Sequence, residues 1–378
     1  MRLQLEHIKI NYLILSIILI LLAFFIIQIF YLDLAVYGVP GQELITFYYY
    51  SIIYTVVAVL FSSLIRKMRG NKERISQIPY SLNIILGGLW ILDGVLQFQP
   101  QMPYAFLTFV IKPSIVSINN IQIQNFLYLG YNIWATNPFQ FDALSGALQI
   151  FIGYSFLINR SGRILKFIAI ISIVWALVIW IFGEGFGGIP EIGVSILTGF
   201  PGSALLYVIL AIPFVSSRFN SREYLQSFLL KSAFFVLVIS LILQLIPVNG
   251  YWNKGIFSQL IFDNTFNQGE SPLLYNILNR IWPILIYHTQ DLNIFLSLLM
   301  ISSSFLIFSR NKIGYLIPIL FITVMWILFQ NMGIYDNPAT DFNSGIVLAL
   351  IIYLGTLDKH LYVGIKDFRK ALTENKIR

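Results

Sequence analysis

Long apolar stretches separated by short polar segments dominate this chain. A membrane-spanning helix needs about 20 consecutive apolar residues, or somewhat fewer when it is short or bent. By this measure the pattern predicts about ten spanning helices and an all-α fold class, a polytopic integral membrane protein. The predicted spans lie near residues 11–31, 45–65, 80–98, 141–158, 164–182, 199–215, 229–247, 291–308, 313–330 and 344–357.

The apolar stretches after residue 80 form two similar series, offset by about 150 residues. The segment 96–100, Leu-Gln-Phe-Gln-Pro, corresponds to 243–247, Leu-Gln-Leu-Ile-Pro, and Trp175 corresponds to Trp326. Each series holds four predicted helices, and an even number gives both copies the same orientation in the membrane. The expected divisions are an N-terminal hairpin with a basic loop (1–79), repeat 1 (80–216), repeat 2 (217–357) and a basic tail (358–378).

The composition supports a membrane protein and excludes cysteine chemistry. The chain is 57% hydrophobic and 11% charged, with a mean hydropathy of +0.78, whereas soluble domains carry about 25% charged residues. It contains no cysteine, which rules out disulfides, thiol catalysis, thiolate zinc sites and cysteine-ligated iron–sulfur clusters.

The net charge of +7 is distributed unevenly across the predicted bundle. All but three of the 24 Lys and Arg residues fall on one side, the exceptions being Lys112, Lys254 and Arg280. Basic loops stay in the cytoplasm, so both termini are expected there. The basic side would face anionic lipid of the inner leaflet, and nucleic acid is not an expected partner.

Two longer segments, 99–140 and 248–290, lie on the predicted outer side. Their apolar residues recur at roughly helical spacing, which predicts short helices at the membrane interface. An aromatic belt that only anchors the spans is the alternative. Gly146 and Gly153, two helical turns apart, predict a close approach between two helices.

Asp93 stands inside a predicted span, where a carboxylate is costly unless it faces the bundle interior or a wet cavity. The equivalent position in the second copy is near Ser240, a neutral residue. A symmetry-breaking functional site is one interpretation, and a shallow carboxyl that reaches interfacial water is the other. Most other acidic residues on the outer side, including Asp142 and Asp341, are expected to be solvated loop charges.

The segment 182–190, Phe-Gly-Glu-Gly-Phe-Gly-Gly-Ile-Pro, predicts a helix end that unwinds at the outer surface. A dinucleotide-binding interpretation is rejected, since that fingerprint follows a strand and opens a helix. Thr198-Gly199 and Ser344-Gly345 are the expected N-caps of the helices that follow. The candidate ligand-binding residues, expected to converge on one outer vestibule, are Asp93, Gln97, Gln99, Gly183, Glu184 and Gly185. The three histidines, His7, His288 and His360, are not spaced to share a metal.

The segment 145–154, continuing to Arg160, resembles the second span of a DoxX-type four-helix module. Where that family more often carries an acidic residue, this chain has Gln149. The segments 90–94 and 183–185 also resemble a group of polytopic membrane proteins of archaea and actinobacteria. The resemblance implies a subunit in a prokaryotic plasma membrane, near the quinone pool, with a quinone as its ligand and a redox enzyme as its partner.

Three functions remain open at this point. The first, and the one favoured, is a non-catalytic membrane subunit or anchor of a redox or respiratory-type complex that binds quinone, with the electron chemistry in a partner. The second is a transporter or channel for a small solute or ion, with Asp93 and Glu184 lining its path. The third is a lipid-handling membrane enzyme that uses the outer carboxylates. Whether the chain is an enzyme is left undecided.

Overall fold

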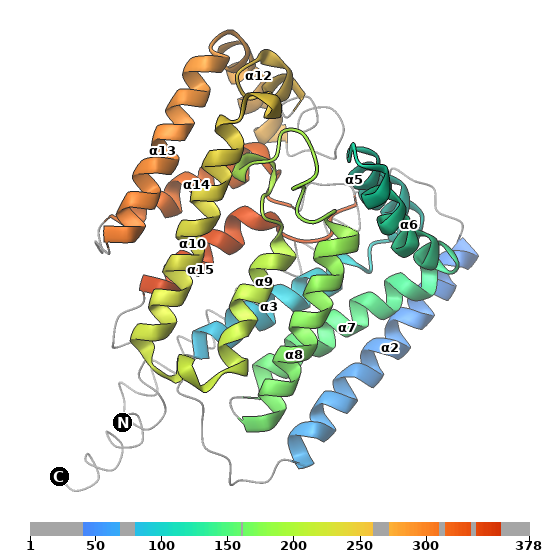
Figure 1. Ribbon diagram of the computed structural model, residues 1–378. Coiled ribbons are helices and arrows are strands. Elements are labelled where there is room, and N and C mark those ends of the chain that lie inside the picture. The colour runs from blue at the N-terminus through green and yellow to red at the C-terminus, as the bar shows by residue number, and fades with distance from the viewer. Residues whose placement is uncertain are drawn as a thin grey trace, which may run out of the picture.

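The computed structural model describes residues 41–68, 80–159, 162–259, 272–309, 314–333 and 338–356 (Figure 1). The predicted span near 11–31, most of the basic loop that ends at residue 79, and the basic tail from 358 onward lie outside the described residues.

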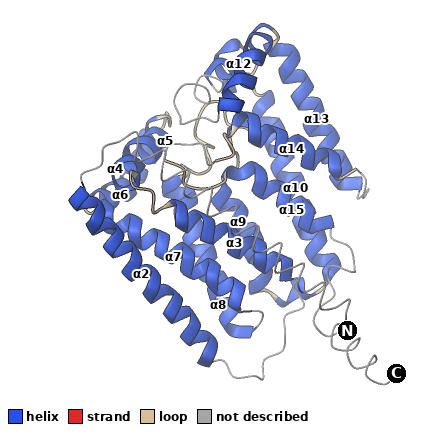
Figure 2. Cartoon of the chain, turned by 180° about the vertical axis from the view of Figure 1, so that it is seen from behind, coloured by secondary structure: helices blue, strands red, loops and turns tan. Residues whose placement is uncertain are grey.

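The described part of the chain is helical throughout and contains no strand (Figure 2). The helices at the predicted spans are α2 (Gly41–Met68), α3 (Tyr80–Leu96), α7 (Pro138–Ile158), α8 (Gly162–Val178), α9 (Ser203–Val215), α10 (Arg222–Leu245), α13 (Thr289–Ser309), α14 (Leu316–Phe329) and α15 (Asn343–Thr356). The helices between them are α4 (Met102–Ala105), α5 (Lys112–Val116), α6 (Ile121–Ala135) and α12 (Pro272–Tyr287). Two π-helical segments, η1 (Phe106–Ile111) and η2 (Ile179–Gly183), join α4 to α5 and extend α8.

The all-α prediction is thus confirmed for the described residues. In the described part of the chain, five helices are long and apolar enough to cross a membrane: Glu43–Ile65, Pro138–Ile158, Gly162–Gly183, Arg222–Leu245 and Thr289–Ser309. The other helices at predicted spans, α3, α9, α14 and α15, are apolar but shorter. Several large apolar side chains on α2 and α13 point outward, such as Ile45, 71% exposed, and Phe308, 74% exposed. An apolar exterior of this kind is suited to contact with lipid.

Helices α3 and α7 pack closely through pairs of glycines. A Cβ atom added to Gly94 would lie 2.7 Å from the carbonyl oxygen of Gly146, and one on Gly153 would lie 2.5 Å from that of Gly87. The predicted close approach at Gly146 and Gly153 is confirmed, because only a residue without a side chain leaves room for the two backbones.

The segment 99–140 folds into the short helices α4, η1, α5 and α6, as its apolar spacing predicted. Helix α6 begins at Asn120, whose side chain accepts hydrogen bonds from the amides of Gln122 and Ile123. Leu107, Ile115 and other apolar side chains of these helices form a small core of their own. The short helices therefore cover one flank of the bundle.

The loops of the bundle gather at opposite ends. In Figure 1 the end of α2 and the starts of α8 and α10 lie toward the lower left of the molecule. The short helices α5 and α6, and the turn that follows α8, lie toward the other end. This second end carries the candidate site.

One predicted helix start was wrong. Thr198 lies in a 3-10 helix, η3 (Ile196–Thr198), where it forms a capping box with Ser195. Helix α9 begins only at Ser203, after Gly202, which has a φ of 93°. The chain needs these extra residues because it turns sharply before it enters the bundle. In the second copy, α15 begins at Asn343, one residue before the predicted cap Ser344.

Candidate functional site

A cavity of about 550 Å³ lies among α3, α7, α8 and α9, with η1 and α6 over it. This volume is in the range of small-molecule sites, which are mostly apolar with a few polar groups. Most of the wall is apolar or aromatic, and it includes the rings of Trp90, Phe106, Trp134, Phe141, Trp175 and Phe182.

The cavity reaches the surface between α6, α7 and α8. Lining residues at this border are strongly exposed, among them Leu129, Ile133 and Leu144. All three are apolar, and they belong to the outward-facing apolar surface of the bundle. An opening with such a rim suits a ligand that arrives from lipid rather than from water.

The inner end of the cavity is polar. Asp93 of α3, Gln97 just after α3 and Tyr207 of α9 are buried there, and Gln149 of α7 lies beside them. Within the described residues, Asp93 Oδ1, Gln97 Oε1, Gln149 Oε1 and the Tyr207 hydroxyl have no hydrogen-bond partner. Buried polar atoms are nearly always paired, so these four atoms are free to accept a partner that the described residues do not provide.

Tyr207 is held in place by aromatic packing. Its ring meets that of Trp90 edge to face at 4.9 Å, and the Trp90 indole donates a hydrogen bond to Ser172 Oγ at 2.9 Å. The Tyr207 hydroxyl neighbours the Asp93 carboxyl, without a hydrogen bond of ordinary geometry between them. The phenol and the carboxyl therefore point into the same small volume.

Glu184 directly follows η2 in the sequence, and in space it lies next to the start of α9. Its Oε1 accepts hydrogen bonds from the Ser203 hydroxyl at 2.7 Å and from the Ala204 amide at 3.0 Å, while Oε2 has no partner in the described part of the chain. The amides at a helix N-terminus favour an anion. Burial nevertheless raises the pKa of Glu184 to about 7, with a further contribution from Asp341.

Asp341 comes from the other half of the chain, just before α15. Its carboxyl accepts hydrogen bonds from the Asn343 amide at 2.5 Å and from the Thr340 hydroxyl at 3.2 Å. Burial raises the pKa of Asp341, and the hydrogen bonds to Asn343, Ser203 and Thr340 oppose this rise. Asp341, held by these hydrogen bonds, is an exception to the expectation that most outer acidic residues are solvated loop charges. Asp142 is another exception, since it is fully buried and accepts a hydrogen bond from the Trp134 indole at 2.8 Å.

A second, polar cavity of about 300 Å³ adjoins the first. Its wall is built by the glycine-rich turns after α8 and before α9 and by the segment before α15. It includes Glu191, Thr198, Asn343 and Ser344. We call the larger space the ligand cavity and the smaller one the polar chamber.

The turns after α8 and α14 have the same backbone conformation. Residues 185–187 and 331–333 all have positive φ angles, between 48° and 71°. The middle amide of each triplet donates to the carbonyl of the tryptophan in the preceding helix, Trp180 or Trp326, at 2.9 Å and 3.2 Å. Three consecutive left-handed residues are rare, so their occurrence at both turns marks the two as a pair.

The same two turns present different side chains. Glu184 Oε1 accepts from the amide of Ala204 at 3.0 Å, and Gln330 Oε1 accepts from the amide of Gly345 at 3.0 Å. In space the counterpart of Glu184 is therefore Gln330. The first copy therefore carries an ionisable group where the second carries a neutral amide.

Of the six candidate residues, four line the ligand cavity: Asp93, Gln97, Gly183 and Glu184. Gln99 is buried elsewhere, and its amide donates to the carbonyls of Leu96 and Ala339. It ties the end of α3 to the loop before α15. Gly185 is not in the wall of either cavity and instead begins the left-handed turn.

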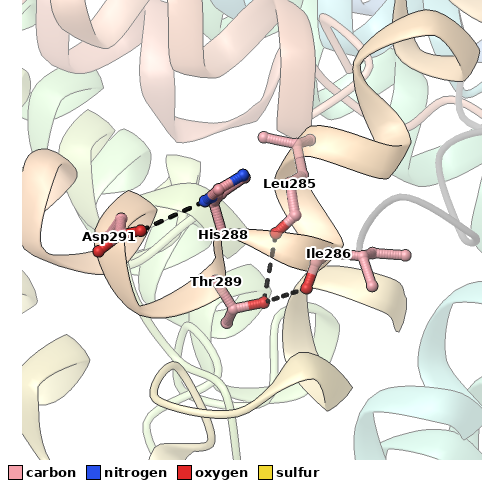
Figure 3. A network of polar contacts seen from close by, with 5 residues as sticks. All are labelled: Leu285, Ile286, His288, Thr289 and Asp291. Carbon is pink, nitrogen blue, oxygen red and sulfur yellow. Dashed lines mark hydrogen bonds and ion pairs between the residues drawn. The ribbon is translucent and has the colours of Figure 1, made fainter.

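His288 is not in the wall of the ligand cavity or of the polar chamber. It lies between α12 and α13, where its Nδ1 is 3.3 Å from Asp291 Oδ2 and both side chains are exposed (Figure 3). The neighbouring Thr289 hydroxyl donates to the carbonyls of Leu285 and Ile286 (Figure 3). These contacts close the corner between the two helices.

Sequence reasoning missed Ser203, Tyr207 and Asp341 as site residues. In the sequence, Asp341 was only one of many outer acidic residues. The signal that could have found Asp341 is its position two residues before α15, next to the turn that Gln330 supports. Among the described residues no group of three His, Asp or Glu side chains is arranged to hold a metal ion.

No protein-family model matches this chain, and no curated protein or solved structure shows significant similarity to it. The resemblance to DoxX-type modules accordingly stays a prediction from the sequence.

Proposed function

We propose that the protein is a multi-pass membrane protein with about ten spans, in which two four-helix units of like orientation follow an N-terminal hairpin. The matched turns support the duplication. In addition, the Trp180 indole donates to the carbonyl of Pro201 at 2.8 Å, and the Trp326 indole donates to that of Phe342 at 2.5 Å. The helices α3, α9, α14 and α15 are shorter than the other spans. They would still cross the bilayer, with the outer turns and short helices occupying the rest of its thickness.

The proposed location is a prokaryotic plasma membrane with both termini in the cytoplasm. Arg163 and Lys166 at the start of α8, and Arg218 and Arg222 before and at the start of α10, lie at the end of the bundle opposite the site. Basic residues at one end favour this orientation. The ligand cavity would then lie in the outer half of the membrane.

We propose that the ligand cavity binds a lipid-soluble molecule with an apolar body and a hydrogen-bonding oxygen head, of the quinone class. The observation that carries this proposal is a lipid-facing aromatic cavity that ends at unpaired buried polar atoms, those of Asp93, Gln97 and Tyr207. The Tyr207 hydroxyl would donate to a ligand oxygen. A partner subunit would supply or accept electrons, since this chain's role is to bind and position the ligand.

The charge of the site separates this proposal from lipid phosphate chemistry. Among the described residues, no Lys, Arg or His lines the ligand cavity or the polar chamber. Three carboxyl groups, those of Asp93, Glu184 and Asp341, do line the ligand cavity. A phosphate head would meet like charge without a cation to offset it, so a lipid-phosphate enzyme is disfavoured.

Transport of a small cation is the second candidate. The wall between the apolar ligand cavity and the polar chamber carries two carboxyl groups, which suit a path for cations. This candidate predicts cation flux into liposomes that contain this protein alone. The quinone-site proposal predicts no such flux, so the measurement distinguishes the two.

The direct test is quinone binding by purified protein in detergent. Quenching of tryptophan fluorescence by decylubiquinone reports occupancy, because Trp90, Trp134 and Trp175 line the cavity. Tyr207→Phe is expected to weaken binding about tenfold, the effect of one hydrogen bond. The matched control is Tyr287→Phe, at a residue that is 75% exposed. Absence of saturable binding, or equal affinity in both variants, contradicts the proposal.

A further inference from the structure

Glu184 and Asp341 stand at the wall that the ligand cavity and the polar chamber share. Of the described residues, six line both spaces: Val110, Gly183, Glu184, Ser203, Thr340 and Asp341. Of these, the two acidic residues are the only ones with a titratable side chain. These two carboxyls can therefore hold a proton at this wall, whereas the hydroxyls of Ser203 and Thr340 can only relay one.

The Ser203 hydroxyl connects the two carboxyls. It donates a hydrogen bond to Glu184 Oε1 at 2.7 Å, and it also interacts with the carboxyl of Asp341. A hydroxyl can donate one hydrogen bond and accept others. When Asp341 is protonated, its O–H can therefore donate to Ser203 Oγ while Ser203 donates to Glu184.

This arrangement permits a balanced proton shift without any redox step. The Asp341 O–H bond breaks as a new O–H bond forms on Ser203, and the original Ser203 O–H bond breaks as a new one forms on Glu184. The net result is the transfer of one proton from Asp341 to Glu184. The free oxygen of Glu184, Oε2, has no other partner within the described residues.

The surroundings favour one shared proton over two negative charges. The titratable groups that face the pair are Asp93 of α3, Tyr207 of α9 and, across the polar chamber, Glu191. None of them supplies a positive charge, and in the part of the chain that the structure describes no basic residue lies in the wall of either space. Two carboxylates this close in a poorly solvated site cannot both ionise without a large cost.

We propose that Glu184, Ser203 and Asp341 form a proton-exchange link, through which the head group of a ligand in the ligand cavity is connected to the polar chamber. This inference rests on the proposed function. It assigns the three residues to proton movement, and it assigns ligand contact to Asp93, Gln97 and Tyr207. A quinone oxygen carries partial negative charge, so it binds best while the nearby link keeps its proton and with it one negative charge fewer.

The test is the pH dependence of decylubiquinone binding, with proton uptake measured in parallel by calorimetry in buffers of different ionisation enthalpy. Affinity should be constant at low pH and fall about tenfold per pH unit above the pKa of the link. Glu184→Gln should bind the probe with an affinity that no longer changes with pH. Ser203→Ala should lose proton uptake, and Ser203→Thr, which keeps the hydroxyl, should restore it. Asp291→Asn, at an exposed site, should behave as the unmodified protein.

The outcomes separate the two proposals. Probe binding with no proton uptake between about pH 5 and 9 overturns the link and leaves the ligand cavity in place. A pH-dependent affinity that Glu184→Gln retains also overturns the link. If probe binding is accompanied by uptake of sodium ions instead of protons, the pair of carboxyls is a cation site and the proton link is overturned. Failure of the probe to bind at any pH contradicts the proposed function itself.

Discussion

Glu184 and Gln330 occupy equivalent positions at the ends of two helices, and each accepts a backbone amide hydrogen bond at 3.0 Å. The second functional atom of each side chain differs in its surroundings. Gln330 Nε2 donates to the carbonyl of Ile196 at 2.6 Å, whereas Glu184 Oε2 has no partner in the described part of the chain. One copy of the turn is thus completed by a neutral amide, and the other keeps a carboxyl available to the cavities.

Exchanging these two residues should have opposite effects on stability. Gln330→Glu places a carboxylate oxygen against the Ile196 carbonyl in a buried site, and a loss of about 3 kcal/mol is expected at neutral pH. Glu184→Gln removes a poorly solvated acid and should leave stability unchanged or higher. Thermal unfolding in detergent measures both. Equal losses in the two variants would contradict the equivalence.

The glycine contacts between α3 and α7 give a second prediction with an internal control. Gly94→Ala should lower stability by about 2 kcal/mol, because its Cβ meets the backbone of Gly146. Gly88→Ala, on the same helix, has no atom within 4 Å of the added Cβ and should cost nothing. Equal melting temperatures of the two variants would show that α3 and α7 do not pack in this way.

Stability should depend on pH through Glu184. Its pKa is raised from 4.5 to about 7 in the folded protein, so the folded state binds a proton more tightly than the unfolded state. Stability should therefore decline as the pH rises from about 4.5 to about 7, by up to about 3 kcal/mol, and level off above that range. Asp341, whose pKa is also raised, adds to the decline. Melting curves of Glu184→Gln should be flatter over the same range.

The two cavities should differ in their access to lipid and water. The chain has no cysteine, so single substitutions can be labelled without background. Ile133→Cys, at the rim of the ligand cavity, should react with a lipid-soluble maleimide and be shielded by decylubiquinone. Glu191→Cys, in the polar chamber, should react with a charged, water-soluble thiosulfonate. If the water-soluble reagent labelled Ile133→Cys and the lipid-soluble reagent labelled Glu191→Cys, the predicted access of the two cavities to lipid and water would be contradicted.

The orientation in the membrane can be tested in the same way. An impermeant reagent added to intact cells should label Asp291→Cys, at the start of α13, and not Lys166→Cys, near the start of α8. Both side chains are exposed. Lysed cells, in which both positions should react, provide the control.

The sequence by itself determined the helical class, the placement of the apolar helices and the close packing at Gly146 and Gly153. These features follow from local composition and spacing, which one segment carries without reference to the others. Asp93 and Glu184 could be chosen from the sequence for a similar reason, since an acid in an apolar stretch or in a glycine-rich helix end is locally unusual.

Only the tertiary structure decided which polar groups meet. Asp341 joins Glu184 through Ser203 across more than a hundred residues of sequence, and Gln330 is the counterpart of Glu184 because the two turns share a backbone path. Whether an acidic residue is solvated or buried depends on what packs over it. That is a property of the assembled bundle, and no window of sequence around Asp142 or Asp341 contains it.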